Sequence, residues 1–285
     1  MKILILGVTG MLGNAFFKQL SKEKYYQVYG TLRNASGRQF FQKNQHSQLL
    51  INVDILDQDS LVAVFEHIRP DIVINCVGII KQLENANSPL NVLPINSMLP
   101  HRLDHLCSLA GVRLVHFSSD CVFSGKKGMY KEQDLSDAQD LYGKSKFIGE
   151  INDSQNSITL RTSIIGHELG SNHSLVDWFL SQKSPVKGYS KAVFSGLPSV
   201  EMARIVNKYI IPKPELSGVY HVSAVAIDKL SLLKIVAKEY KKDIEIIPDE
   251  QLCIDRSLDS TLFRQKTGYA PAEWSELVKM MYELR

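Results

Sequence analysis

Short apolar segments alternate with helical segments through the first half of the chain. The expected strands are Ile3–Leu6, Tyr26–Leu32, Leu49–Val53, Asp71–Asn75, Arg113–Ser118 and Ser157–Arg161, and the helices placed among them are Leu12–Ser21, Ser60–Ile68, Leu99–Ala110 and Leu141–Ile151. Parallel strands need a crossover connection, which is usually a helix. The alternation therefore predicts an α/β fold with a doubly wound parallel sheet that helices cover on both faces.

The alternation of strands and helices becomes less regular after about Ser163. The later expected helices are Leu175–Leu180, Val200–Ile210, Asp228–Lys241 and Glu273–Tyr282, the later strands are Gly218–Val222 and Ile244–Ile247, and a stretch punctuated by Pro and Gly runs from Ser184 to Pro198. We predict a sheet domain over residues 1–162 and a smaller, mainly substrate-binding region over 163–285. Segments at about 199–222 are expected to return to the first domain.

Composition excludes several classes of protein. The chain has 285 residues, of which 44% are hydrophobic and 22% charged, and its net charge of +3 comes from interspersed acids and bases. We therefore expect neither nucleic acid nor a membrane surface as a partner. The first apolar run is too short for a signal peptide, and no window reaches the ~18 apolar residues of a membrane span. The four cysteines form no C-x-x-C pair, so we expect reduced thiols in a cytoplasmic protein.

The first strand ends at a turn with the spacing Gly7-x-x-Gly10-x-x-Gly13, and a helix follows. Gly7 would permit the tight turn, Gly10 would let the backbone approach a pyrophosphate, and Gly13 would let the helix pack closely on the strand. The helix N-terminus adds free N–H groups and a partial positive charge. Glycine spacing alone is a weak signal, but its place between an N-terminal strand and a helix favours a dinucleotide site. We include Thr9, Met11 and Leu12 of this turn among the cofactor-binding residues.

The end of the second strand bears on which dinucleotide binds. Enzymes that select NAD commonly place an acid there, whereas this chain has Thr31-Leu32-Arg33. Arg33 can pair bidentately with a 2′-phosphate, which favours NADP(H), and the alternative is an ordinary surface arginine.

Residues after the third and fourth strands extend the expected cofactor site. Asp54 could accept a hydrogen bond from an adenine amino group, or it could cap the helix that begins near Asp57. The carboxyl ends of parallel strands converge on a bound ligand. The remaining expected cofactor residues at these ends are Ile55, Cys76, Val77 and Gly78.

Tyr142 and Lys146 lie four residues apart on an expected helix, so they project from one face. A phenol has a pKa of ~10, and a nearby cation lowers that value, which Lys146 is placed to do. Ser119, at the end of the fifth strand, could hold a carbonyl oxygen while Tyr142 protonates it. A Tyr-x-x-x-Lys pattern is common by chance, but its conjunction with the glycine turn and Ser119 predicts carbonyl reduction by an external hydride.

Several blocks carry a family resemblance: Gly7 to Gly13, Asn75-Cys76, Ser118 to Gly125, Tyr130 to Asp134, Tyr142 to Glu150, Arg161 to Ser163 and Arg256 to Asp259. They resemble the extended short-chain dehydrogenase/reductases, and within them the dTDP-4-dehydrorhamnose reductase group, over essentially the whole chain. The resemblance implies a Rossmann fold with Ser119, Tyr142 and Lys146 as catalytic triad, and with Arg33 in place of an acid the expected cofactor is NADPH, with NADH less favoured. Asn96 matches the asparagine that often joins this triad, and Asn96, Tyr142 and Lys146 would also contact the cofactor. The implied reaction reduces the C4 keto group of a nucleotide-activated 6-deoxy sugar in surface polysaccharide precursor synthesis.

Departures from that group bear on the substrate. Ser119-Asp120-Cys121 stands where rhamnose reductases carry Thr-Asp-Tyr, and Ile164-Ile165 stands where they usually carry tryptophan. The stretch from Asp255 to Tyr269 looks closer to reductases of UDP-linked 2-acetamido-2,6-dideoxy-4-keto hexoses. That substrate class is favoured, and dTDP-4-dehydrorhamnose comes next. We assign Asp120, Cys121, Lys187 and Arg256 to substrate binding, Arg256 and Lys187 through the diphosphate, with a solvated surface charge as the alternative for both.

Two other functions stay open. The first is an epimerase or dehydratase with tightly held NAD, although Cys121 stands where a dehydratase would carry its second acid. The second is a non-catalytic NADP-binding subunit that regulates a partner enzyme, although such proteins tend to lose the tyrosine or the lysine. We expect no metal, because His101 and His105 near Cys107 lack an accompanying carboxylate pattern. A homodimer is one expected assembly.

Overall fold

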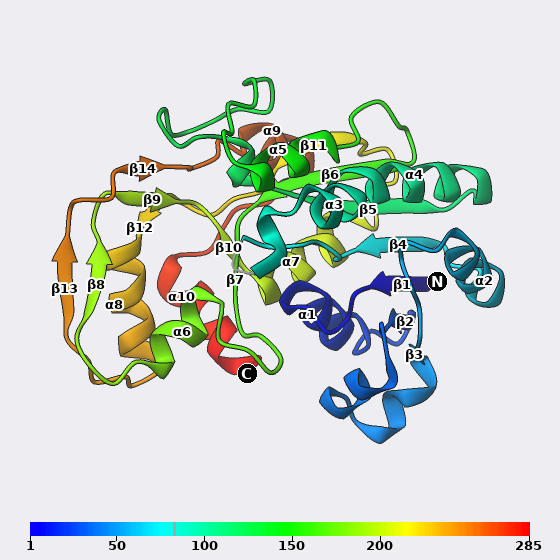
Figure 1. The fold of residues 1–285 in the computed structure, drawn as a ribbon, viewed down its shortest axis with the longest axis horizontal. Helices are drawn as coiled ribbons and strands as arrows, with labels where there is room; N and C mark the ends of the chain where they lie inside the picture. The colour runs from blue at the N-terminus through cyan, green and yellow to red at the C-terminus, as the bar shows by residue number, and fades with distance from the viewer. Residues whose placement is uncertain (82–83) are drawn as a thin grey trace.

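Seven parallel strands form the central sheet, in the order β11-β6-β5-β4-β1-β2-β3 (Figure 1). The structure is a computed structural model that describes residues 1–81 and 84–285. The strands are β1 (Lys2–Leu6), β2 (Gln27–Thr31), β3 (Leu49–Leu50), β4 (Ile72–Asn75), β5 (Arg113–Ser119), β6 (Ser157–Thr162) and β11 (Gly218–His221). The chain moves from β1 outward to β3 and then crosses back to β4, so the predicted doubly wound sheet is confirmed.

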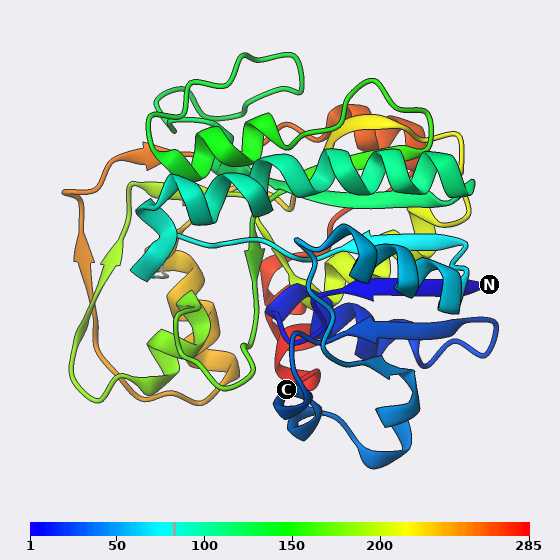
Figure 2. The same ribbon diagram turned by 45° about the vertical axis from the view of Figure 1, so that its right-hand side comes forward.

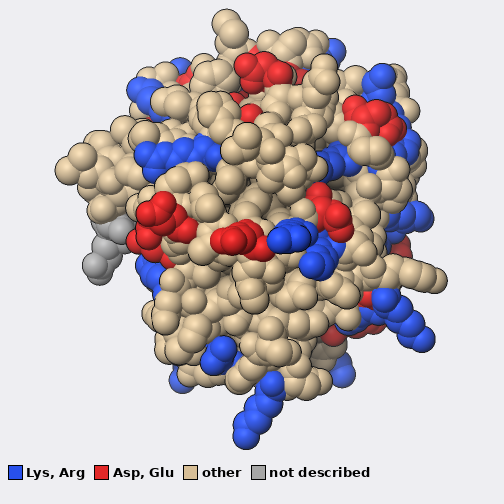
Figure 3. All heavy atoms as spheres, turned by 90° about the vertical axis from the view of Figure 1, so that its right-hand side faces the viewer, with Lys and Arg blue, Asp and Glu red and all other residues tan. Residues whose placement is uncertain are grey.

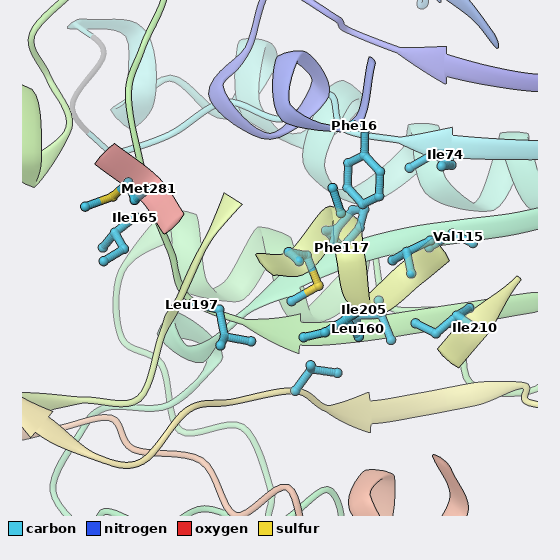
Figure 4. Close-up of a cluster of buried hydrophobic side chains, with 14 of the residues drawn as sticks. Phe16, Ile74, Val115, Phe117, Leu160, Ile165, Leu197, Ile205, Ile210 and Met281 are labelled. Carbon is cyan, nitrogen blue, oxygen red and sulfur yellow. The ribbon is translucent and has the colours of Figure 1, made fainter. Parts of the chain in front are cut away.

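Helices pack on both faces of this sheet. Along β1, Ile3 and Ile5 join one hydrophobic cluster and Leu4 and Leu6 join another, so the strand is buried on both sides. The first cluster includes α1 (Met11–Leu20), α7 (Ser199–Ile205) and α10 (Trp274–Glu283), and Figure 4 shows part of it around Phe16 and Phe117. The second includes α2 (Gln58–Ile68) and α4 (Leu99–Ala110), and Figure 2 shows α4 running along β5.

The helix that carries Tyr142 is α5 (Leu141–Ile148), which packs against the π-helical segment η4 (Leu93–Met98). The expected helix over 141–151 is therefore too long. A Cβ on Gly149 would lie 2.0 Å from the Asn96 carbonyl oxygen, so the chain after Ile148 runs against the backbone of η4. The short helical elements that precede η4 along the chain are η1 (Ala35–Phe40), η2 (Lys43–Gln48), η3 (Glu84–Asn87) and α3 (Pro89–Val92).

The expected strand over 49–53 also ends early. β3 stops at Leu50, and Asn52 takes a left-handed conformation with φ of 58°, which turns the chain out of the strand. The expected helix over 200–210 begins at Ser199 as α7 and continues as a π-helix, η6 (Val206–Ile210). α7 packs on α1, and β11 pairs with β6. The division of the chain into a cofactor domain and a substrate region stays a prediction.

The second half of the chain builds three small sheets. They pair β7 (Ile164–Ile165) with β10 (Leu197–Pro198), β8 (Val186–Tyr189) with β13 (Ile246–Asp249), and β9 (Ala192–Phe194) with both β12 (Ile227–Asp228) and β14 (Ile254–Asp255). Besides α7 and α10, the helices in this half are α6 (Leu175–Ser181), α8 (Lys229–Glu239) and α9 (Thr261–Thr267). The sequence did not predict α9, and it placed β13 two residues early, at 244–247. Most of these strands pair with distant segments, so local periodicity gives little sign of them.

The surface carries charges of both signs. On the face drawn in Figure 3, lysines and arginines are interspersed with acidic side chains. No helix within residues 1–81 and 84–285 has the length and apolar character needed to cross a lipid bilayer.

Candidate functional site

The turn between β1 and α1 is shaped by its glycines. Gly7 has a φ of +81°, and a Cβ on Gly13 would lie 2.2 Å from the Gly7 carbonyl oxygen, so the close packing of the helix requires glycine at both positions. A Cβ on Gly10 would meet only the Gly7 carbonyl oxygen, at 3.5 Å, among the described atoms. Packing within the protein therefore does not account for Gly10, whereas the close approach of a ligand would.

A groove of about 440 Å³ opens beside this turn. It brings together eight of the expected cofactor residues: Gly7, Thr9, Gly10, Arg33, Ile55, Cys76, Val77 and Gly78. The N-terminus of α1 has no side-chain cap at Gly10 and no acidic residue in its first turn. Its free N–H groups and partial positive charge suit an anion at this end of the groove.

The groove also contains residues that the sequence analysis missed. They are Thr31, Leu32, Asn34, Ser36, Gly37, Phe40 and Val53, and most follow the end of β2. Ser36 donates a hydrogen bond to Asn34 Oδ1 at 2.5 Å, and Thr31 Oγ1 accepts from the Gly7 backbone N–H at 3.1 Å. Thr31 thus supports the glycine turn from the strand end where NAD-selecting enzymes place an acid. The polar residues Asn34 and Ser36, which follow closely after Arg33, were the sequence signal that could have indicated this part of the groove.

Met11, Leu12 and Gly13 form the first turn of α1. Asp54 is exposed, and its Oδ1 accepts from the Leu56 backbone N–H at 2.9 Å. The residue that caps α2 is Asp57, which accepts from the Asp59 N–H at 3.0 Å. The alternative in which Asp54 caps this helix is therefore wrong, and its contact with adenine stays a prediction.

Asn96 is buried in η4 and uses its side chain within the protein. Its Oδ1 accepts from the Ile79 N–H at 2.8 Å, and its Nδ2 donates to the Ile79 carbonyl at 3.0 Å and to Ser145 Oγ at 3.2 Å. These contacts tie the loop after β4 to α5. Asn96 therefore positions the elements around the expected nicotinamide end of the groove, and its own contact with cofactor stays a prediction.

Ser119 and Tyr142 come together where α5 begins. Ser119 ends β5, and its Oγ accepts from the Cys121 N–H at 3.1 Å and donates to Asp120 Oδ1 at 3.1 Å. Asp140 caps α5 by accepting from the Gly143 N–H at 2.7 Å. A Cβ on Gly143 would lie 2.2 Å from the Cys121 carbonyl oxygen, so only glycine allows this approach of α5 to the turn after Ser119.

The pKa of Tyr142 differs from the value that the sequence led us to expect. Burial raises the pKa of Tyr142, the charge of Cys121 raises it further, and a hydrogen bond with Ser119 lowers it. Lys146 Nζ donates to the Phe117 carbonyl oxygen at 2.6 Å, and burial lowers the pKa of Lys146 to about 8. The pKa of Tyr142 is therefore raised rather than lowered as expected, because burial dominates and the main groups that act on the phenol do not include Lys146.

A second lysine lies beside the tyrosine. Lys81 Nζ is 5.4 Å from the centroid of the Tyr142 ring and pairs with Asp140 Oδ2 at 2.7 Å. Lys81 also lowers the pKa of the Cys121 thiol, although burial is stronger and raises that pKa to about 11. The sequence gave no signal for Lys81, because it lies in a loop far from Tyr142 along the chain.

Three of the four expected substrate residues lie together. Asp120 is buried, which raises its pKa, while the charges of Arg256 and Lys229 lower it. Arg256 Nε donates to the Phe123 carbonyl oxygen at 2.9 Å, and the charge of Arg256 also acts on Cys121. Lys187 is not brought to this group: its side chain is 61% exposed and pairs with Asp249 Oδ2 at 2.8 Å between β8 and β13.

Metal-ligating side chains do not cluster in the part of the chain that the structure describes. No three histidine, cysteine, aspartate or glutamate side chains there are placed to share an ion. His101 Nε2 instead lies 2.7 Å from the Ile148 carbonyl oxygen.

A serine from the end of a parallel strand meets a tyrosine from the next helix. The groove over the glycine turn includes neither Ser119, Tyr142 nor Lys146 in its lining. The doubly wound sheet and the glycine turn are the features expected of an extended short-chain dehydrogenase/reductase. Within that class the chain belongs to the family described as RmlD substrate binding domain, which matches residues 1–284.

Individual relatives match this chain over different lengths. The dTDP-4-dehydrorhamnose reductase of Aggregatibacter actinomycetemcomitans is 25% identical over 307 residues, covering 98% of this chain and 97% of that protein. Methionine adenosyltransferase 2 subunit beta of Bos taurus is 27% identical over 154 residues, so the match spans 52% of this chain and only 41% of that relative. The structure of dTDP-4-dehydrorhamnose reductase from Bacillus anthracis in complex with NADP shares the fold, with a TM-score of 0.80, 20% identity and 99% coverage of both chains.

Proposed function

We propose that this protein is an NADPH-dependent reductase that acts on the C4 keto group of a nucleotide-activated 6-deoxy-4-keto sugar. The observation that carries the proposal is the meeting of Ser119 and Tyr142 at the carboxyl end of β5. The reductase relative, which matches nearly the whole chain, supports the same reaction type. A UDP-linked N-acetyl sugar is favoured, dTDP-4-dehydrorhamnose comes next, and the product would serve surface polysaccharide synthesis. A cytoplasmic location and a homodimer stay predictions.

The groove has the features that NADPH needs. The open space at Gly10 and the uncapped N-terminus of α1 would receive the pyrophosphate, and Arg33 would pair with the 2′-phosphate. Bound there, NADPH supplies the hydride that reduces the carbonyl carbon. The NADP bound to the Bacillus anthracis reductase supports this assignment of the cofactor.

Arg33→Ala is expected to weaken NADPH binding roughly tenfold or more while leaving NADH binding nearly unchanged, because only NADPH carries the 2′-phosphate. The measurement is a fluorescence titration of both cofactors. Arg102→Ala, at an exposed position of α4, is the matched control and should bind both cofactors like the wild type. An equal loss of NADH affinity would show that Arg33 does not select the phosphate.

The chain's own residues then handle the proton and the carbonyl oxygen. Because burial raises its pKa, Tyr142 holds its proton at neutral pH and is ready to donate it to the oxygen that becomes the alcohol. Ser119, whose hydroxyl donates to Asp120 in this structure, would turn that donor to the substrate oxygen and orient it. Lys146, one turn along α5, and Lys81, beside the ring, are the positive charges available to the phenolate that remains. Solvent then returns a proton to Tyr142.

The pKa of Lys146 predicts a basic limit to activity. Its pKa is about 8, so kcat at saturating substrate should fall above that pH as the ammonium loses its proton, whereas Tyr142 loses its proton only at higher pH. The rate of NADPH oxidation across this pH range measures the effect. Lys229 also has a pKa of about 8, so the two lysines must be separated. Lys146→Arg keeps the charge and should shift the decline to higher pH; if Lys229→Arg shifts it instead, the assignment to Lys146 is wrong.

The direct test of function incubates the protein with NADPH and a panel of UDP- and dTDP-linked 4-keto sugars. Loss of NADPH absorbance together with a 4-hydroxy product identified by NMR is the expected result. An optical spectrum of freshly purified protein tests the epimerase alternative, because a tightly held NAD would stay with the protein. No reduction of any panel member would contradict the proposal.

A second candidate function is a non-catalytic NADP-binding subunit of another enzyme. The match to methionine adenosyltransferase 2 subunit beta over half of this chain favours it. Against it, this chain has both Tyr142 and Lys146, which lie one turn apart on α5. A protein that binds NADPH but reduces no sugar would favour this second function.

A further inference from the structure

The strands β12, β9 and β14 form a small sheet that we call the platform, beyond the carboxyl ends of the central strands (Figure 1). Val193 of the middle strand aligns with Asp228 on one side and with Asp255 on the other. The next residues along the chain are Lys229 and Arg256. The platform therefore carries a cation after each edge strand, with the two backbones roughly 10 Å apart.

The platform lies directly against the turn that follows Ser119. The Asp255 N–H donates to the Gly125 carbonyl at 2.8 Å, and Arg256 Nε donates to the Phe123 carbonyl at 2.9 Å. A Cβ on Gly125 would lie 3.1 Å from Arg256 Cγ, so no side chain separates the two segments there. This packing fixes Arg256 relative to Asp120 and Cys121, and Lys229, after the other edge strand, also acts on the charge of Asp120.

Lys229 is a half-buried cation without a carboxylate partner. Its Nζ lies 3.5 Å from the centroid of the Phe194 ring, and no carboxylate among the described side chains is within 4.0 Å of it. Burial lowers the pKa of Lys229 to about 8, and the charges of Asp120 and Cys121 act in the opposite direction. An aromatic face covers one side of the ammonium and accepts no conventional hydrogen bond, so its N–H donors remain available to an anion.

We propose that Lys229 binds the diphosphate of the nucleotide-sugar substrate together with Arg256. This inference rests on the proposed function. A guanidinium offers paired N–H groups to phosphate oxygens, and the ammonium adds a compact point charge on a flexible stem. Because Asp120 follows Ser119 directly and feels the charge of both cations, a diphosphate held by them places the attached sugar next to the reacting groups.

The test measures binding of UDP, dTDP and uridine by calorimetry to protein saturated with NADPH. Lys229→Met should weaken UDP and dTDP binding roughly 10- to 100-fold, because a hydrogen bond to a charged group is lost. Uridine binding should be unchanged, since uridine has no phosphate. Lys229→Arg restores a positive charge and should recover most of the affinity. Lys234→Met, at an exposed position of the same helix, is the matched control.

Two results would overturn the inference. In the first, Lys229→Met binds UDP as tightly as the wild type but unfolds at a lower temperature, which would mean that Lys229 only packs on Phe194. In the second, the wild type binds neither UDP nor dTDP. Both are equilibrium measurements without turnover, so they are distinct from a failure of the proposed function, which is seen as a lack of 4-keto sugar reduction by the wild type.

Discussion

Tyr142→Phe should lower kcat by about 10²- to 10⁴-fold, the usual contribution of a positioned general acid, with little change in NADPH affinity. The substitution removes one hydroxyl and keeps the ring, which packs at the start of α5 beside Lys81. Reduction then needs a proton from water or a less well placed group. Steady-state NADPH oxidation with a 4-keto sugar measures the loss, and a fluorescence titration measures cofactor affinity.

The control for this variant is Tyr25→Phe. Tyr25 is 84% exposed, so its hydroxyl should contribute nothing to turnover. A Tyr142→Phe enzyme with wild-type kcat would show that another group donates the proton. Asp120 would then be the first group to examine, because burial raises its pKa and it accepts a hydrogen bond from Ser119.

Arg161→Met is expected to lower the free energy of unfolding by about 3–5 kcal/mol, because it leaves the charge of Glu150 buried and uncompensated. Arg161 Nε and NH2 donate to the two Glu150 carboxylate oxygens at 2.7 and 2.6 Å, and both side chains are about 95% buried, at 5% and 4% exposure. Ser118 Oγ donates to the same carboxylate at 2.6 Å. Urea unfolding followed by circular dichroism measures the change.

The double variant Glu150→Met/Arg161→Met should recover part of that loss, since it removes the stranded charge as well. Lys191→Met is the control, because Lys191 pairs with Glu250 at the surface and both side chains are more than half exposed, at 52% and 69%. It should leave the urea midpoint nearly unchanged. An Arg161→Met protein that unfolds at the wild-type midpoint would show that the buried pair does not stabilise the fold.

Sequence patterns were most informative about groups that lie close together along the chain. The apolar run before Gly7, the glycine spacing after it and the four-residue spacing of Tyr142 and Lys146 each describe one strand, one turn or one helix face. The carboxyl ends of parallel strands meet at one edge of the sheet, so placing a residue after a strand also places it near the groove. Arg33, Ile55 and Cys76 were found in this way, and the structure brings them to the same groove.

The sequence by itself therefore determined the doubly wound sheet and the glycine turn, and it placed Tyr142 and Lys146 on one helix, because each depends on the periodicity or position of a short segment. Tertiary structure alone decided which distant residues share a site. In the tertiary structure Lys187 forms a surface ion pair with Asp249, and Lys229 lies close enough to Asp120 for the two charges to interact. Lys146 donates a hydrogen bond to a backbone carbonyl. The physical reason is that burial and charge depend on every segment packed around a side chain, and the order of residues along one segment does not contain that information.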